Sequence, residues 1–257
     1  MKKIILLLTL VFAVAFMGAC GQSKANGSNG DSGKKEKVLI MGTSADFPPF
    51  ETRDTSGNVV GFDVDLGNYI AKKLGYKLEV KDMKFDGLIG ALQSKRVDMV
   101  LSGMSATEDR KKNVDFSTPY HHSGEMFVTK KDSSIKAVDD LKGKTIGVQL
   151  GSIQEEGAKN LQKTVKFNTK AMDDSTTLIQ ELLSNRIQAA YLDKSVAEGY
   201  IKNQGLIGFD DPTSSSPGMG IAFPKGSNLV DDVNKIIKEL QDSGKMDEMK
   251  AKWIKNN

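Results

Sequence analysis

Residues 97–112 read VDMVLSGMSATEDRKK, and this stretch decides the fold class. Its apolar start, Val97–Ser102, is typical of a buried strand, and small and hydroxyl residues follow directly. Thr107 then precedes a charged run whose threonine cap and early acids favour a helix. A loop that opens a helix N-terminus at the end of a strand presents free N–H groups to an anion. The stretch therefore predicts either a capped surface helix or an anion site to which Arg110 adds a guanidinium.

The same alternation of strand and helix extends in both directions from this stretch. Apolar periodicity predicts further strands at 38–43, 76–81, 126–130, 145–149, 165–169, 187–193 and 218–226. It predicts helices at 61–75, 85–95, from about 152, and at 176–186, 195–203, 229–240 and 245–254. This order indicates an α/β protein with two successive lobes and largely parallel sheets, in which the chain returns to the first lobe at its end.

The first 37 residues predict export and tethering. Residues 1–19 have two lysines, an apolar run and small residues, the layout of a signal peptide. Cys20, the one cysteine of the chain, follows Met17-Gly18-Ala19 and resembles a bacterial lipobox, although Met17 stands where leucine is usual; an incidental cysteine is the alternative. Residues 20–37 are rich in Gly, Ser, Asn and Lys, which predicts a lipidated cysteine followed by a flexible tether.

The ends of the predicted strands are where a ligand site is expected, because open α/β sheets bind ligands outside the carboxyl ends of their strands. Four segments qualify: 43–50, 102–110, 149–154 and 192–195. Ser152 and Glu155 have capping-box spacing, and Asp193 is equally a helix cap or a ligand-binding carboxylate. Phe47 and Phe85 either fix loops to the core or line a pocket.

Several classes of function are disfavoured by what these segments contain. The formal net charge is +3, and lysines are scattered among acids, so no nucleic-acid site is expected. Neither a metal site nor a cofactor is expected, since the adjacent His121 and His122 point to opposite sides of an extended chain. A serine-nucleophile elbow is missing, and the glycine-rich segment 147–156 lacks the lysine of a phosphate loop.

Taken together, the motifs resemble the substrate-binding lipoproteins of polar amino acid ABC transporters, solute-binding protein family 3. The resemblance is carried by IMGTSADFPPFE, GFDVDLGNYIAKKLGY, SGMSATEDRKK, GVQLGSIQEE, the Asp193 strand end and GIAFPKGS, and it runs from Val38 to Trp253. IMGTSADF, SGMSATEDRKK and GVQLGSIQEE look most like the arginine-binding members.

The resemblance implies a two-lobe Venus-flytrap fold of the type II periplasmic-binding-protein class, with a mixed sheet flanked by helices in each lobe. Lobe 1 would be 38–120 plus 218–257, and lobe 2 would be 121–217. The ligand α-carboxylate would bind at Ser105, Thr107, Arg110 and Ser152, and its α-ammonium at Asp193 with the backbone of Ser102 and Gly103. Phe47 and Phe85 would flank the ligand side chain, with Gln149 and Gln154 nearby.

Two departures from the family pattern bear on the ligand. Ser44 stands where some relatives that bind cationic or amide side chains carry an acid, so the partner of a guanidinium is left open among Asp46, Asp82 and Glu125. His121 and His122 stand where many relatives continue with aromatic residues.

The expected function is therefore a non-enzymatic, monomeric binding protein, lipid-anchored at the extracytoplasmic face of the cell membrane. It would capture a free polar L-amino acid, arginine first, and pass it to an ABC transporter permease. The alternatives are lysine, histidine, glutamine or cystine as the ligand. A dehydratase or a sensor domain on the same scaffold is a further alternative.

Overall fold

The computed structural model of the chain describes residues 36–254. The predicted signal peptide, Cys20 and nearly all of the predicted tether lie outside these residues. Within 36–254, no helix has both the length and the apolar character that crossing a bilayer requires.

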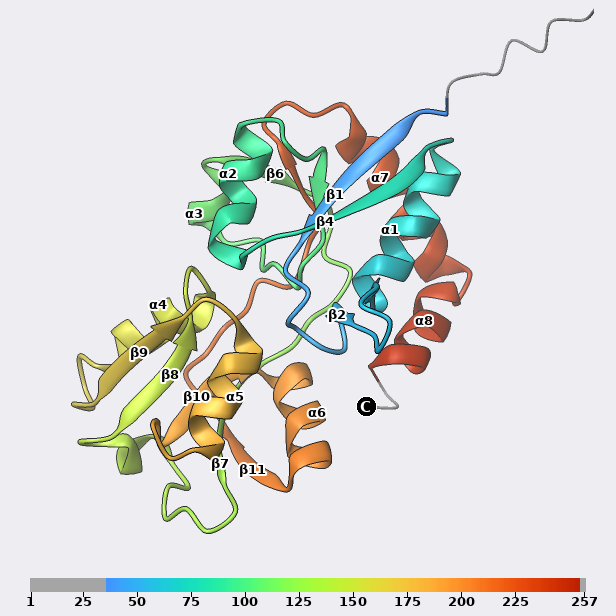
Figure 1. The fold of residues 1–257 in the computed structure, drawn as a ribbon. Coiled ribbons are helices and arrows are strands. Elements are labelled where there is room, and N and C mark those ends of the chain that lie inside the picture. Colours follow the sequence, from blue (N-terminus) through green and yellow to red (C-terminus); the bar gives the residue numbers. More distant parts are fainter. Residues whose placement is uncertain (1–35, 255–257) are drawn as a thin grey trace, which may run out of the picture. The chain divides into compact units, whose positions relative to one another are not determined.

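The first sheet has five strands in the order β4-β1-β5-β12-β6. These are Lys77–Asp82, Val38–Thr43, Met99–Val100, Ala222–Pro224 and Val114–Phe116. β1 runs parallel to β4 and β5, whereas β12 pairs antiparallel with β5 and β6. Helices α1 (Phe62–Lys73), α7 (Leu229–Asp242) and α8 (Lys245–Trp253) cover one face, and α2 (Leu88–Gln93) covers the other (Figure 1). The short strands β2 (Thr52–Arg53) and β3 (Val59–Val60) form a separate hairpin.

The second sheet also has five strands, in the order β11-β7-β10-β8-β9. These are Leu206–Asp210, Glu125–Lys130, Ala189–Asp193, Thr145–Gln149 and Asn168–Met172. β8 is parallel to β9 and β10, and β7 is antiparallel to β10 and β11. Helices α5 (Ser175–Leu183) and α6 (Lys194–Gln204) pack on one face and α4 (Ile153–Leu161) on the other.

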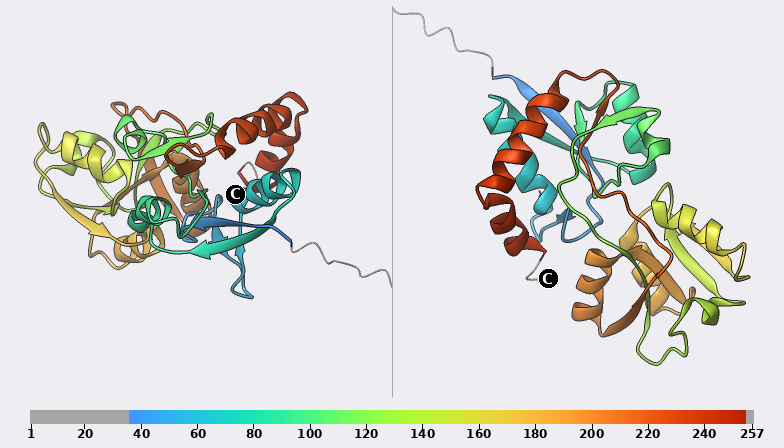
Figure 2. Two further views of the ribbon diagram at one scale, coloured as in Figure 1. Left: turned by 90° about the horizontal axis from the view of Figure 1, so that it is seen from above. Right: turned by 180° about the vertical axis from the view of Figure 1, so that it is seen from behind.

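The chain crosses between the two sheets twice, once between β6 and β7 and once between β11 and β12, and Figure 2 shows the two segments running side by side. His121 and Met219 form a bridge between them, with Met219 N donating to the carbonyl oxygen of His121 at 2.8 Å. Tyr120 N donates in turn to the carbonyl oxygen of Met219 at 2.9 Å. The two crossing segments are therefore tied to each other by backbone hydrogen bonds.

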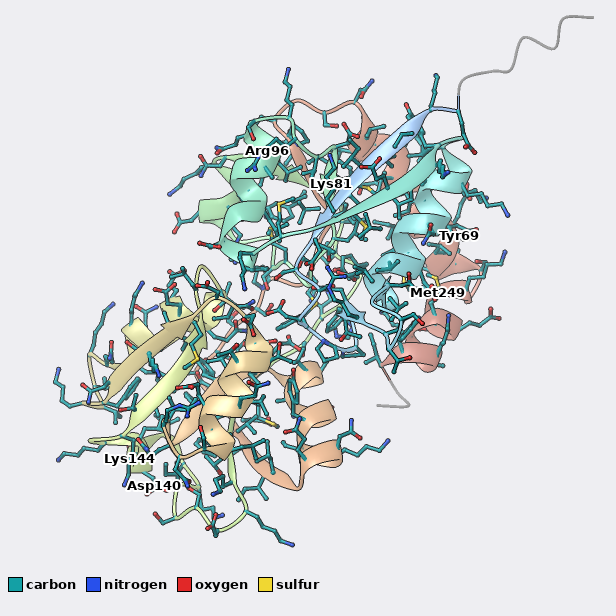
Figure 3. The ribbon with its side chains drawn as sticks, viewed as in Figure 1. Tyr69, Lys81, Arg96, Asp140, Lys144 and Met249 are labelled. Atoms are coloured by element: carbon teal, nitrogen blue, oxygen red, sulfur yellow. The ribbon has the colours of Figure 1, made fainter. Side chains whose placement is uncertain are left out.

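Side-chain alternation along the strands divides the core into three clusters. On β10, Ala190 and Leu192 join a large cluster with α5 and α6, and Ala189 and Tyr191 join a second cluster under α4. A third cluster lies between α2 and the first sheet. The large cluster also includes the apolar faces of α1 and α7, and Tyr69 of α1 and Met249 of α8 pack against it (Figure 3).

The observed elements follow the predicted ones with a few corrections. Strand 97–102 shortens to β5, and the predicted strand 165–169 is instead β9, which begins at Asn168. The sheets are mixed, which confirms what the resemblance implies. They are not largely parallel as the alternation of strands and helices indicated, because β12 and β7 run against their neighbours. The strands β2, β3, β6 and β11 were not predicted. The helix expected from Phe85 begins as a 3-10 turn, η1 (Phe85–Gly87), and only then continues as α2.

Gly61, which precedes α1, is the position where the fold most needs a glycine. Its φ is 144°, and a Cβ added there would lie 2.1 Å from the carbonyl oxygen of Phe50. We expect Gly61→Ala to lower the free energy of unfolding in urea by at least about 3 kcal/mol, because the clash is with backbone.

Gly90, inside α2, is the matched control, because a Cβ there would meet nothing within 4 Å. Gly90→Ala is expected to raise the free energy of unfolding by about 0.5–1 kcal/mol. Equal stability of the two variants would contradict this view of the α1 start.

Candidate functional site

A pocket lies where strand ends of the two sheets face each other. Its lining residues come from the loops after β1, β5 and β8, from the last residues of β8 and β10, from α3 (Glu108–Lys111) and the start of α4, from η1 and from the second crossing segment. They are Asp46, Phe47, Phe85, Gly103, Ser105, Arg110, Gln149, Ser152, Ile153, Gln154, Asp193 and Met219. Nine of the eleven residues predicted to bind a ligand are in this set.

Arg110 provides the positive charge of the pocket. Thr107 caps α3, its Oγ1 accepting from Arg110 N at 3.3 Å, which places the guanidinium one turn inside the helix. The guanidinium donates to the carbonyl oxygens of Ser105 and Gly151, each at 2.9 Å, and lies 5.3 Å from the centre of the Phe85 ring. Burial lowers the pKa of Arg110 to about 10, so the group stays charged at neutral pH. Within residues 36–254, no carboxylate forms an ion pair with it.

Asp193 ends β10 and provides one of two negative charges. Its Oδ1 accepts from Ser123 Oγ at 3.0 Å and from Ser195 N at 2.8 Å, so it caps α6 and faces the pocket as well. Burial raises the pKa of Asp193 to about 7, and the hydrogen bonds from Ser123 and Ser195 oppose this rise. An external cation at Asp193 would favour its ionised form.

His121 extends this hydrogen-bond chain into the first crossing segment. Its Nε2 lies 3.1 Å from Ser195 Oγ, which in turn lies 3.1 Å from Ser123 Oγ. Burial lowers the pKa of His121 to about 4, so the ring is neutral at neutral pH. The residue that departs from the family pattern therefore helps to place the serines that hold Asp193.

Asp46 provides the second negative charge and joins loops of both sheets. Its side chain accepts from Ser44 Oγ at 2.7 Å, from Gln149 Nε2 at 2.9 Å and from Ser175 N at 2.6 Å. It is 8% exposed, and burial raises its pKa above the usual range. Ser44, which stands where some relatives carry an acid, acts here as a donor to Asp46.

The other two candidate acids lie outside the pocket lining. Asp82 forms an ion pair with Arg53 at 2.6 Å and accepts from Ala45 N at 2.9 Å. Glu125 is buried behind Gln154, which donates to it, and burial raises its pKa to about 9, so it is neutral at neutral pH. Of the three candidates, Asp46 is therefore the one placed to contact a ligand.

Two predicted residues, Ser102 and Thr107, are not in the lining set. Ser102 is 1% exposed; its hydroxyl donates to Glu51 Oε1 at 2.9 Å and accepts from Ser44 N at 3.0 Å, which places it under the pocket wall. Thr107 is occupied as the cap of α3. Ile153 and Met219, both apolar, line the pocket without having been predicted, and no sequence motif marks them.

The capping box predicted at the start of α4 is half formed. Ser152 Oγ accepts from Glu155 N at 3.1 Å as expected, but Glu155 accepts from Gly151 N at 2.8 Å instead of from Ser152 N. This bond holds Gly151, whose carbonyl oxygen accepts from Arg110. In the described part of the chain, no group of three or more His, Cys, Asp or Glu is placed to hold a metal ion.

Comparison with known proteins gives consistent matches. Residues 39–256 match the model of the bacterial extracellular solute-binding proteins, family 3. The arginine-binding extracellular protein ArtP of Bacillus subtilis (strain 168) is 50% identical over 257 residues, covering 99% of this chain and 98% of that protein.

Two solved structures are also similar. An ancestral arginine-binding protein bound to arginine gives a TM-score of 0.80 at 45% identity, covering 85% of this chain and 98% of that one. The ancestral amino acid-binding protein AncCDT-1, a precursor of cyclohexadienyl dehydratase, gives 0.80 at 36% identity, covering 84% and 95%.

The hydrogen bonds at Asp193 predict how its pKa responds to mutation. Ser123→Ala removes a donor to the carboxylate, so the pKa of Asp193 should rise further above about 7. Carbon-13 NMR titration of the Asp193 carboxyl measures this rise directly. Ser56→Ala, in an exposed turn, is the control and should leave the titration unchanged; an unchanged pKa in Ser123→Ala would contradict the role of the serine.

Proposed function

The chain belongs to the bacterial extracellular solute-binding proteins of family 3, and we propose that it captures a free basic L-amino acid, L-arginine first, for delivery to an ABC importer. The name of its Bacillus subtilis relative and the arginine-bound ancestral structure support arginine. The pocket supports it independently, through its charges.

The charge balance of the pocket is the observation that carries the proposal. The lining includes one cation, Arg110, and two carboxylates, Asp46 and Asp193, a net charge of −1 when all three are ionised. An amino acid with a neutral side chain brings no net charge, whereas arginine or lysine brings +1 and compensates the pocket fully. Buried charges are costly without partners, so a basic amino acid fits this set best.

Each charged group of the ligand then has one partner. The α-carboxylate binds Arg110 in the bidentate manner that suits a guanidinium, with Ser105 and Ser152 beside it. The α-ammonium binds Asp193, next to Gly103, and the cationic end of the side chain binds Asp46. Phe47 and Phe85 cover the aliphatic stem, and Gln149 and Gln154 offer amide groups near it.

We also propose that 38–120 with 218–257, and 121–217, act as two lobes that close on the ligand about the crossing segments. Three observed contacts join the sheets at the pocket: Arg110 with Gly151, and Asp46 with Gln149 and with Ser175. A ligand that neutralises Arg110 from one side and Asp193 from the other stabilises this arrangement selectively.

Binding without catalysis is the function proposed. A dehydratase would need a general acid that reaches the ligand. Asp46, Asp193 and Glu125 all have raised pKa values. Asp46 and Asp193 line the pocket but are assigned to the cationic groups of the ligand. Glu125 lies behind Gln154 and outside the pocket lining. The chain is proposed to act as a monomer.

Asp46→Asn tests the assignment of the side-chain partner. It removes the charge opposite the ligand guanidinium, so Kd for L-arginine should rise by at least about thirtyfold, or about 2 kcal/mol. Kd for L-glutamine, measured by the same calorimetric titration, should change much less.

Asp82→Asn is the matched control, because Asp82 ends β4, accepts from Ala45 N beside Asp46 and is paired with Arg53 outside the pocket. It should leave the preference for arginine over glutamine intact. Loss of that preference in Asp82→Asn, or its persistence in Asp46→Asn, would show that the partner has been assigned to the wrong acid.

Membrane anchoring is proposed from the sequence alone. Diacylation of Cys20 would hold the protein at the extracytoplasmic face, since two acyl chains anchor stably where one does not. Cys20→Ala should abolish labelling by a palmitate analogue and move the protein from the membrane fraction to the medium or periplasm. Ser23→Ala is the control, and retention of unlabelled Cys20→Ala protein on membranes would contradict the anchor.

A further inference from the structure

Two carboxyl groups, Glu51 and Asp63, lie fully buried under one wall of the pocket. Each is 0% exposed. Glu51 belongs to the loop after β1, and Asp63 lies in the first turn of α1. Neither lines the pocket, and in the described residues no Lys, Arg or His forms an ion pair with either.

The two groups hold the backbone that forms the wall. Asp63 Oδ2 accepts from Gly103 N at 2.8 Å and from Tyr120 Oη at 2.9 Å. Glu51 Oε1 accepts from Ser102 Oγ at 2.9 Å, and Ser102 Oγ accepts from Ser44 N at 3.0 Å. The pair therefore connects the loop after β1, the loop after β5 and the start of the first crossing segment.

The two remaining oxygens, Glu51 Oε2 and Asp63 Oδ1, are buried and have no other partner. Glu51 and Asp63 lie close enough for each to shift the pKa of the other. If both groups were ionised, two like charges would face each other without a compensating cation, which is strongly unfavourable in a buried site. A single proton between the two oxygens gives each a partner and removes one charge.

We propose that Glu51 is a neutral acid that donates its proton from Oε2 to the Asp63 carboxylate, and that this pair positions the Ser102–Gly103 wall of the pocket. The proton is assigned to Glu51 because Asp63 accepts two further donors, Gly103 N–H and Tyr120 O–H, which stabilise its charge. Among residues 36–254, the Glu51 carboxyl accepts only from the Ser102 hydroxyl. This inference rests on the proposed function where it concerns ligand affinity, but the location of the proton does not.

The electrostatic surroundings agree with this assignment. Burial, followed by the charge of Asp63, raises the pKa of Glu51 well above its usual range. Burial raises the pKa of Asp63 too, while the bonds from Gly103 and Tyr120 oppose the rise. The other titratable groups that act on the pair are Asp46 and Tyr120; the first is an acid and the second is neutral at neutral pH.

The Ser102–Gly103 wall, which the Glu51–Asp63 pair holds in place, reaches the pocket surface at Gly103. Gly103 lines the pocket with φ of 53°, and a Cβ added there would lie 2.7 Å from the Phe47 ring. A shift of Gly103 would therefore move Phe47, and a shift of Ser102 would move Ser44, the donor to Asp46. The pair is thus a positioning element for Phe47 and Asp46.

The test compares two amide variants. Glu51→Gln keeps every bond, because the amide accepts from Ser102 and donates to Asp63, so Kd for arginine should stay within about threefold of the wild type. Asp63→Asn forces the charge onto Glu51, which has fewer donors, so Kd should rise about tenfold or more. Glu79→Gln and Asp232→Asn, on the exposed surface, are the matched controls and should change nothing. The reverse order of the two effects, or equal loss in both, overturns the assignment.

Two readouts do not depend on ligand binding or on Asp63→Asn folding. Infrared spectroscopy of the wild type at neutral pH should show a protonated-carboxyl band that Glu51→Gln lacks. Glu125 is present in both proteins, so its signal cancels in the difference spectrum between wild type and Glu51→Gln. The folded state holds a proton that unfolded Glu51 releases, so wild-type stability relative to Glu51→Gln should fall as pH rises above about 4.5. Absence of the difference band, or a pH-independent stability difference, overturns the shared proton even if arginine binds as proposed.

Discussion

A partly buried guanidinium that forms no ion pair with a carboxylate of residues 36–254 is the constraint on which the site depends. Arg110 reaches carbonyl oxygens of two loops, Ser105 in the first sheet's loop and Gly151 in the second's, and rests over Phe85. These carbonyl oxygens accept from two of its N–H groups but do not neutralise its charge. The helix cap at Thr107, the turn at Gly151 and the neighbouring strand ends hold Arg110 in place. An anionic ligand group would neutralise its charge.

The two carboxylates of the pocket lie at or just after the ends of strands. Asp193 caps α6 while facing the pocket, and Asp46 accepts hydrogen bonds from loops of both sheets. Both have raised pKa values because they are buried, so a bound cation favours the ionised form of each. Under the proposed function, the pocket would therefore select its ligand through charge balance.

Sequence reasoning located the strand ends well because each one carries a local signal. Apolar runs end at Thr43, Ser102, Gln149 and Asp193, and caps or glycines follow them. β9 was misplaced because it is an edge strand with four exposed residues out of five, so its pairing with β8 leaves no apolar pattern. Phe167, the aromatic residue of the predicted run 165–169, instead packs under α4.

The choice among acids was beyond the sequence for a different reason. No local sequence signal distinguishes Asp46, Asp82 and Glu125 from one another. Only the tertiary arrangement shows that Asp46 lines the pocket, that Asp82 is ion-paired and that Glu125 is buried and neutral. Glu51 and Asp63 likewise resemble ordinary polar residues of a loop and of a helix start. Their burial depends on how α1 packs against the loop after β1, which no short motif encodes.

The most direct test of the charge-balance account is a calorimetric titration of the ligand-stripped protein with L-arginine and with L-citrulline. The two ligands have nearly the same shape and differ by one positive charge. The account predicts that arginine binds at least about thirtyfold more tightly, because only its guanidinium compensates Asp46. Equal affinities, or tighter binding of citrulline, would contradict it and would mean that the pocket selects its ligand without using the second carboxylate.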